Sequence, residues 1–293
     1  MSTLLNIQNK IRATKNTGQL TKALEMISVT KQKKAREYLI FNSAIRDGIR
    51  KIINQLYFQE KLNNLDNEIL PKYFRKNTES SKKHLILLIM SQRGLCGSIN
   101  TLLIQKLINY KENILSKNKN IKFDIIKVNK YAQKISRSLN YNIVAYFDNI
   151  NDLPSIEDTL PISDLVKKLY DEYETIHIAY TQFVKPGQTT PVVRPILPIN
   201  VSTGWEENYL SSTPYIIEPN PITVLEEIAR LYIDLEIYYA ILTSQASEHT
   251  SRMIAMKKAS DNAKNLVKTL TLLYNKERQA KITKQTIEIT SSI

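Results

Sequence analysis

Two glycines, Gly94 and Gly97, lie in a turn that follows an apolar run ending at Met90, and a helical pattern comes directly after them. Backbone N–H groups at such a strand-to-helix turn bind phosphate in many nucleotide-binding folds. The remaining parts of those signatures are missing here. No third glycine follows, a strand near Asp124 offers no convincing acidic partner for a ribose, and no glycine is followed by lysine. Glycine also allows a tight turn at positive φ, so we expect a structural turn.

The other residues that could do chemistry are scattered. His84, His177 and His249 are the only histidines, and their spacing is not that of metal ligands. His249 falls in an apolar helical seam, where a polar residue more often fixes the register. Cys96 is the only cysteine, which excludes an intrachain disulfide and favours a reducing compartment. The sequence therefore predicts no catalytic group, no metal and no cofactor.

The net charge is unusual. The chain of 293 residues has 42% hydrophobic and 24% charged residues, which is ordinary, but its formal net charge is +13. Such a charge predicts an acidic partner, which could be nucleic acid, an anionic membrane or an acidic protein surface. Against nucleic acid, no basic region leads into the helical seam, and no aromatic stacking pattern is interleaved with basic residues.

No segment reads as a membrane span or a secretion signal. The longest apolar run, near residues 85–90, is far short of the roughly 20 residues that a span needs. The N-terminal residues already carry a helical pattern, without the apolar core of a signal peptide. We expect a protein of the cytoplasm of a bacterium-like cell, with any membrane association made through partners.

Glycine and proline divide the chain into three parts. All 10 prolines lie between Pro71 and Pro221, and residues 222–293 contain neither proline nor glycine. Because these residues end helices, we predict long helices in residues 1–70 and 221–293, with a separate domain in residues 71–220.

The C-terminal part has the pattern of a coiled-coil seam. Pro221 suits the first turn of a helix, and Asn220 before it is a candidate cap. Apolar residues then recur with alternating spacings of three and four, interrupted only by His249 and Ser260. The predicted seam is Leu225, Ile228, Tyr232, Leu235, Tyr239, Leu242, Ala246, His249, Met253, Met256, Ser260, Ala263, Val267, Leu270 and Tyr274.

The N-terminal part has a less regular stripe, and a basic cluster at residues 31–36 lies within it. A stripe this long cannot bury itself, so we expect the two terminal helices to pair in an antiparallel coiled coil. The predicted stripe is Leu4, Ile7, Ile11, Leu20, Leu24, Ile27, Ala35, Tyr38, Ile45, Ile49, Ile52 and Leu56.

The middle part alternates strand-like and helical segments. Continuous apolar strands alternating with helices favour a largely parallel sheet with helices on its faces. Strands are predicted at residues 84–90, 121–128, 141–147, 175–184 and 191–199, and helices at 100–117, 129–139 and 161–174.

Four segments, in the same order along the chain, resemble the gamma subunit of F-type ATP synthases. The most specific is the C-terminal block from Ala246 to Ile289, and the resemblance extends from near residue 5 to 290. One departure is Leu24, where the family usually has Met. The other segments are "NIQNKIRATKNTGQLTKALEMISVTKQKKARE", "SQRGLCGSINT" and "YIIEPNP".

The resemblance implies a fold and a role. The fold is α/β, with a long antiparallel coiled coil of the two terminal helices and a central Rossmann-like α/β domain at its foot. The role is that of the central rotor shaft, which turns inside the ring of alpha and beta subunits and couples proton flow to ATP synthesis. The shaft has no catalytic site of its own, and its further implied partners are the epsilon and delta subunits and the membrane ring of c subunits.

The resemblance also implies which residues meet these partners. Contacts with beta subunits are expected at two places, the Gly94 turn and the C-terminal helix, and a contact with the c ring is expected at the foot. The beta-facing residues are Arg252, Arg278, Gln279, Thr283, Arg93 and Cys96, and the foot residues are Glu218 and Tyr215.

Two readings therefore remain at this stage. The first is the rotor shaft, located peripherally at the cytoplasmic side of a bacterial inner membrane. The second is a freestanding basic coiled-coil scaffold or nucleic-acid-binding protein. The sequence leaves open the coupling ion and whether the central sheet is fully parallel.

Overall fold

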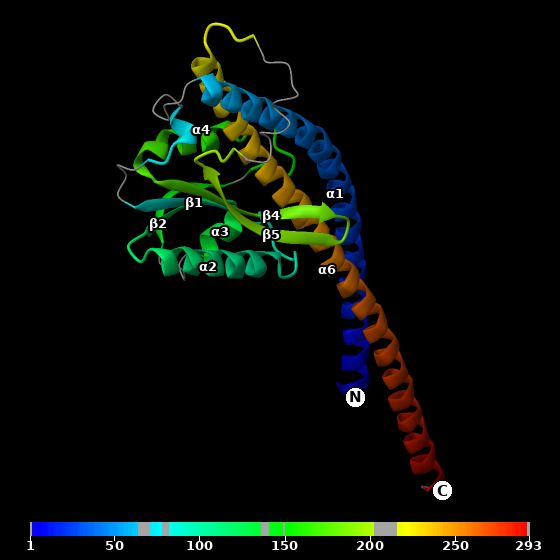
Figure 1. The fold of residues 1–293 in the computed structure, drawn as a ribbon. Helices are drawn as coiled ribbons and strands as arrows, with labels where there is room; N and C mark the ends of the chain where they lie inside the picture. Colours follow the sequence, from blue (N-terminus) through cyan, green and yellow to red (C-terminus); the bar gives the residue numbers. More distant parts are fainter. Residues whose placement is uncertain are drawn as a thin grey trace.

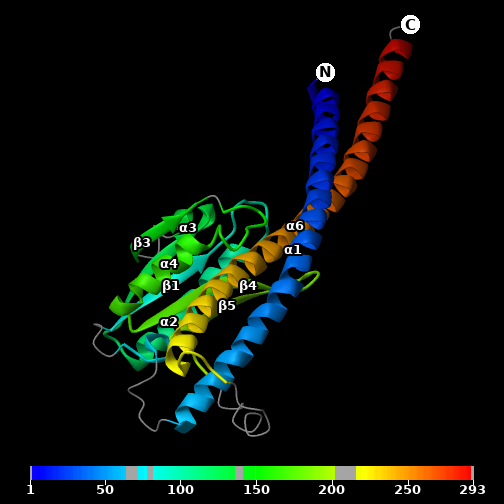
Figure 2. The same cartoon turned by 90° about the horizontal axis from the view of Figure 1, so that it is seen from above.

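Two long helices run side by side, and a compact α/β domain lies against one part of them (Figure 1). The computed structural model describes residues 2–63, 71–77, 82–135, 141–148, 150–201 and 216–291. The long helices are α1 (Ser2–Asn63) and α6 (Pro221–Thr290). Both chain termini lie at the same end, away from the α/β domain, so the helix pair is antiparallel as predicted (Figure 2).

Helix α6 begins where the sequence predicted. Asn220 is its N-cap, and the side-chain oxygen accepts a hydrogen bond from the backbone N–H of Thr223 at 2.9 Å. Pro221 occupies the first turn, where its missing N–H costs nothing. At about 1.5 Å per residue, the 70 residues of α6 span about 105 Å.

The predicted seam of α6 is confirmed. Every seam position from Leu225 to Tyr274 is buried or half-buried. Beyond Tyr274, every described residue of α6 is exposed, because α6 continues past the N-terminal end of α1 (Figures 1 and 2).

The predicted stripe of α1 is wrong at four positions. Leu20, Ile27, Tyr38 and Ile45 are 62%, 52%, 51% and 38% exposed. Among the buried positions of α1 in this region, Thr21, Ser28 and Gln32 are polar and Leu39 is apolar, and none of these four was in the predicted stripe; Ala35, which was predicted, is also buried.

Near Leu20 the reason is the close approach of the two helices. A Cβ atom added to Gly18 of α1 would lie 3.3 Å from the Cβ of Ala263 in α6. Large side chains do not fit between backbones at this separation, so this contact is built from small residues and Leu20 faces outward. Farther along α1, Leu39 and Leu56 are buried, so this reason does not extend to Tyr38 and Ile45.

A five-stranded sheet forms the centre of the α/β domain, in the order β3-β2-β1-β4-β5. The first four strands in this order are parallel, and β5 pairs antiparallel with β4 at one edge. The predicted largely parallel sheet is thus correct, with one antiparallel edge strand. The strands are β1 (Lys83–Ile89), β2 (Lys122–Val128), β3 (Asn142–Phe147), β4 (Thr175–Lys185) and β5 (Gln188–Leu197).

Helices cover both faces of the sheet. Helix α2 (Ile99–Lys117) and the short α3 (Lys130–Ile135) lie on one face, while α4 (Leu160–Leu169) and part of α6 lie on the other. Two single 3-10 turns, Lys72–Phe74 and Tyr170–Glu172, complete the described elements. No helix in the described ranges is long and apolar enough to cross a membrane.

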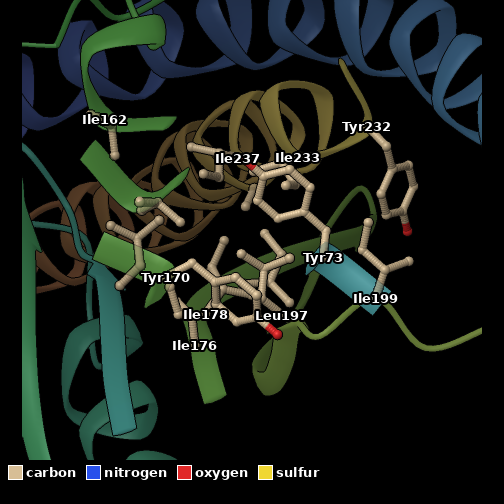
Figure 3. Packing of buried hydrophobic residues seen from close by; sticks show 14 of the residues in the cluster. Tyr73, Ile162, Tyr170, Ile176, Ile178, Leu197, Ile199, Tyr232, Ile233 and Ile237 are labelled. Atoms are coloured by element: carbon tan, nitrogen blue, oxygen red, sulfur yellow. The ribbon is translucent and has the colours of Figure 1, made fainter. Parts of the chain in front are cut away.

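The larger hydrophobic core joins α6 to the sheet. Side chains from β4 and β5 point toward α6, with Ile176, Ile178 and Leu197 opposite Ile233 and Ile237 (Figure 3). Because α6 belongs both to this core and to the helix pair, it connects the α/β domain to the long helices. The division into domains at residues 70 and 220 stays a prediction, although all strands lie between residues 83 and 197.

Candidate functional site

The turn from Ser91 to Ser98 lies at the carboxyl end of β1. Strand β1 has β2 on one side and β4 on the other, so the chain changes direction across the sheet here. Ligands of open parallel sheets bind at such a position. Leu95 and Gly97 adopt φ values of +60° and +64° in this turn.

The backbone N–H groups of this turn already bind an anion, and that anion is part of the chain. The N–H of Gln92 donates to Oε2 of Glu248 at 2.9 Å, and the N–H of Arg93 donates to Oε1 at 3.1 Å. Glu248 belongs to α6 and is 4% exposed. A carboxylate from the long helix thus takes the place that a phosphate holds in a nucleotide-binding turn, which gives a physical account of the structural role expected for this turn.

Arg252 completes this connection. Its guanidinium forms an ion pair with Glu248 and donates to the backbone oxygens of Gly94 at 3.2 Å and of Arg93 at 3.3 Å. The residue is only 7% exposed. Its predicted contact with a beta subunit is untested, but in this structure its donors point inward and fix the turn against α6.

At Gly94 the same turn packs closely against the side chain of Tyr131. A Cβ at this position would lie 2.9 Å from the hydroxyl oxygen of Tyr131. Cys96 is 3% exposed and its thiol lies 3.7 Å from Oγ of Ser91. Burial raises the pKa of the Cys96 thiol. Cys96 was predicted as a partner contact, yet its side chain lies inside the turn.

A cleft of about 220 Å³ opens beside the turn, between α1 and α6. Two cations at its edge, Lys31 and Arg93, both form ion pairs with Asp152. Burial favours a higher pKa for Asp152, but the hydrogen bond and charge of Lys31, aided by Arg93, hold that pKa below its usual value. The lining residues are Leu24, Ile27, Ser28, Lys31, Arg93, Gly94, Leu95, His249 and Arg252.

His249 in this cleft is uncharged at neutral pH. Burial and the charge of Arg252 lower its pKa to about 4, and Nη1 of Arg252 lies 3.3 Å from Nδ1 of the imidazole. His249 projects from α6 into the cleft that α1 and the turn also line. Its role in setting the register of the seam stays a prediction.

The outer surface around the cleft combines basic and apolar side chains. The side chain of Arg93 is 67% exposed, and Leu95 and Ile27 are 66% and 52% exposed. Leu95 and Ile27 were not among the predicted contact residues. Their exposure depends on the positive φ of Leu95 and on the packing of α1, neither of which the sequence pattern reveals.

The other predicted contact residues of α6 form a separate region. Arg278, Gln279 and Thr283 lie on the part of α6 beyond Tyr274, and all three are exposed. The hydroxyl of Thr283 donates to the backbone oxygen of Gln279 at 3.0 Å. The structure does not bring these residues close to the Gly94 turn.

The predicted foot residue Glu218 lies at the opposite end of the molecule (Figure 1). Glu218 is exposed just before α6 begins, beside Ile216, which is 96% exposed. Tyr215 lies outside the described residues. Among the described residues, no group of three or more histidine, cysteine or carboxylate side chains could hold a metal ion.

The long helix pair, the α/β domain and the order of the motifs can now be compared with known proteins. The profile of the family described as "ATP synthase" matches residues 3–293. The ATP synthase gamma chain of Haemophilus influenzae is 31% identical over 286 residues, which cover 97% of this chain and 96% of that one. The chain belongs to the ATP synthase gamma chain family.

Two further comparisons agree with this membership. The gamma chain of Dehalococcoides mccartyi is 32% identical over 294 residues, covering 99% of this chain and 97% of that one. A rotor chain of the mitochondrial ATP synthase of Euglena gracilis has the same fold, with a TM-score of 0.64 at 18% identity, covering 96% of this chain and 99% of that one. The predicted fold of this gamma family member is confirmed.

Proposed function

We propose that this chain is the central rotor shaft of an F-type ATP synthase, which couples ion flow through a membrane sector to ATP synthesis on partner subunits. The observation that carries the proposal is the shape of the helix pair. Helix α6 is anchored in the α/β domain at one end and is fully exposed beyond Tyr274 at the other. Such an element can transmit rotation from the foot to a surrounding ring, and it has no catalytic role of its own.

Within this proposal, the partner surfaces are the places where the predicted contact residues are exposed. Arg93 in the turn and Arg278, Gln279 and Thr283 on the tip of α6 are exposed, and we assign them to contacts with acidic loops of beta subunits. Exposed ion pairs contribute only about 0–1 kcal/mol each, which suits contacts that must break in every rotation. We assign Arg252 and Cys96 a supporting role, because their side chains hold the turn from inside.

At the other end, Glu218 and Tyr215 would meet the c ring, with the epsilon and delta subunits completing the complex. The alpha subunits would alternate with the beta subunits around the shaft. The location would be peripheral, at the cytoplasmic side of a bacterial inner membrane.

The mechanism follows from the asymmetry of the surface. The basic and apolar face around Arg93 and Leu95 lies on one side of the helix pair, so only one beta subunit can meet it at a time. As the shaft turns, each beta subunit gains and loses these contacts in sequence. A partner whose conformations differ in their contacts with the shaft changes its nucleotide affinity by that difference.

The family membership does not favour the freestanding scaffold or the nucleic-acid-binding protein. The acidic loops of the beta subunits proposed above would be sufficient to account for the net charge of +13.

Co-expression with alpha and beta subunits tests the proposal. We expect a complex that hydrolyses ATP and that pumps protons once it is joined to the membrane sector. Arg278→Glu should lower proton pumping per ATP hydrolysed, whereas Lys106→Glu, the same change of charge on the exposed face of α2, should leave it unchanged. If no ATPase-active complex forms with the wild-type chain, the rotor function is wrong. Unchanged pumping in the Arg278 variant would remove that residue from the contact.

A further inference from the structure

A buried carboxylate lies where the two long helices meet the sheet. Glu236 of α6 is 2% exposed. Its Oε1 accepts a hydrogen bond from the hydroxyl of Tyr232 at 2.7 Å, and its Oε2 forms an ion pair with Arg194 of β5. The Nε atom of Arg46, which belongs to α1, lies 3.9 Å from Oε1. The carboxylate of Glu236 in α6 therefore interacts with one cation from α1 and one from β5.

The arginine from α1 is held firmly in this position. The guanidinium of Arg46 lies over the ring of Tyr239 in α6, 3.9 Å from the ring centroid. It also donates to Oδ1 of Asp47 at 2.8 Å. Its side chain is only 18% exposed, so the cation cannot simply turn toward solvent.

This link joins both long helices to the sheet through one carboxylate, whereas the ion pair of Lys31 with Asp152 joins α1 to the α/β domain without α6. Helix α6 lies between α1 and the sheet (Figures 1 and 2), so Arg46, Glu236 and Arg194 form a charged connection from α1 through α6 to β5. The pair of Lys167 and Asp234, with a distance of 2.8 Å, joins only α4 and α6.

The charged groups of the link restrict the angle between the α/β domain and the helix pair more strongly than apolar packing alone would. Apolar contacts are non-directional, whereas the hydrogen-bonded charges of Glu236 and Arg194 keep their energy only in a narrow range of geometry. The Arg46 guanidinium is attracted to the same carboxylate at 3.9 Å without a hydrogen bond. Burial disfavours the charged form of Arg194, but the nearby Glu236 carboxylate raises the pKa of the guanidinium, so it stays charged. A rotation of the foot about the helix pair would pull these charges apart in a site with little water.

We propose that Glu236 is a positioning residue that fixes the angle between the α/β domain and the two-helix shaft. The proposal rests on the rotor function proposed above. Without this link, torque from the foot would twist the joint before it reached the tip of α6.

The angular stiffness of the joint tests the proposal. The full chain is assembled with alpha and beta subunits, the ring is fixed to a surface, and a bead is attached to the foot through Lys119→Cys. With the ring stalled, the variance of the bead angle is inversely proportional to the stiffness of the shaft. We expect Glu236→Gln to raise this variance at least twofold, because it removes the charge but keeps the side-chain shape.

Asp234→Asn is the matched control. It makes the same change two residues away on α6 and breaks a pair that does not involve α1, so its variance should stay at the wild-type value. A variance in the Glu236 variant equal to wild type, or an equal increase in both variants, would overturn the proposal. Merely lower stability would reduce the yield of complex without changing the variance of the complexes that form.

A second variant covers the case in which Glu236→Gln fails to assemble. Arg46→Gln removes only the connection to α1 and keeps the pair of Glu236 with Arg194. It should raise the variance in the same direction, and an unchanged variance would refute the link. A wild-type chain that forms no active complex would contradict the rotor function, an outcome distinct from the failure of Glu236.

Discussion

The side chains of Glu248 and Arg252 determine what the Gly94 turn can do. Glu248 accepts from two backbone N–H groups of the turn, and Arg252 donates to two of its carbonyls. The four hydrogen bonds and the ion pair hold β1, the turn and α6 together. A surface built in this way presents Arg93 and Leu95 in a fixed orientation, which a partner contact under load requires.

Replacing Glu248 should therefore be costly. Glu248→Gln would leave the buried guanidinium of Arg252 without its counter-ion, and breaking a buried ion pair costs about 3–5 kcal/mol. Urea unfolding of the purified chain should show a loss of about 3 kcal/mol in the free energy of unfolding. Glu288→Gln, on the same helix, breaks the exposed pair with Lys284 and should change it by less than about 0.5 kcal/mol. Equal effects would contradict the role of Glu248.

A second buried cluster makes stability depend on pH. Nε2 of His177 lies 2.9 Å from Nδ1 of His84, and its Nδ1 lies 3.1 Å from the hydroxyl of Tyr110. Burial, with the neighbouring His84, lowers the pKa of His177 to about 3, and burial lowers the pKa of His84 as well. Between pH 6.5, near the usual pKa, and about pH 3, the unfolded chain binds protons that the folded chain excludes, so stability falls as the pH falls.

His177 contributes a slope of about 1.4 kcal/mol per pH unit in that window. We expect His177→Gln to reduce the slope of unfolding free energy between pH 6 and pH 4 by about this amount, while leaving the slope above pH 7.5 unchanged. An acid slope identical to that of the wild-type chain would show that His177 does not titrate on unfolding.

Single-residue predictions succeeded where the local sequence determines the outcome. Asn220 and Pro221 start α6 because a cap and a proline act within one turn. The bonds of Glu248 to the turn and of Glu236 to Arg46 and Arg194 were not predictable, because they join residues 42 to 190 positions apart. Tertiary packing alone brings them together.

The two long helices show the same contrast at the level of elements. The seam of α6 was predicted correctly because its apolar residues do face the core. The stripe of α1 was misplaced at Leu20, Ile27, Tyr38 and Ile45. Near Leu20 the helices approach too closely for large side chains and use small residues instead. The strands were found because parallel strands buried on both faces are continuously apolar.

The two glycines of α1 allow this close approach to be tested. Gly18 faces Ala263 at 3.3 Å, whereas a Cβ at Gly48 would have no neighbour within 4 Å. Gly18→Leu should force the helices apart and lower the free energy of unfolding by about 1–3 kcal/mol. Gly48→Ala should raise it by up to about 1 kcal/mol, because alanine favours the helix. Urea unfolding measures both, and a stabilising leucine at position 18 would contradict the close contact.

The whole molecule places its exposed features at two ends. Glu218 and Ile216 lie beside the α/β domain, and Arg278 and Thr283 lie on the exposed part of α6. Between them, α6 runs through the main core and against α1, and after Pro221 it contains no proline or glycine. This arrangement is that of a shaft, with exposed surfaces at both ends and one continuous helix between them.

Rotation of the foot is the most direct test of this account. The wild-type chain carrying Lys119→Cys is assembled with alpha and beta subunits on a surface, and a bead on the foot is followed in the presence of ATP. The account predicts continuous rotation of the bead in one direction, at a rate that rises with ATP concentration until it saturates. A bead that stays fixed in angle while the same complexes hydrolyse ATP would contradict it.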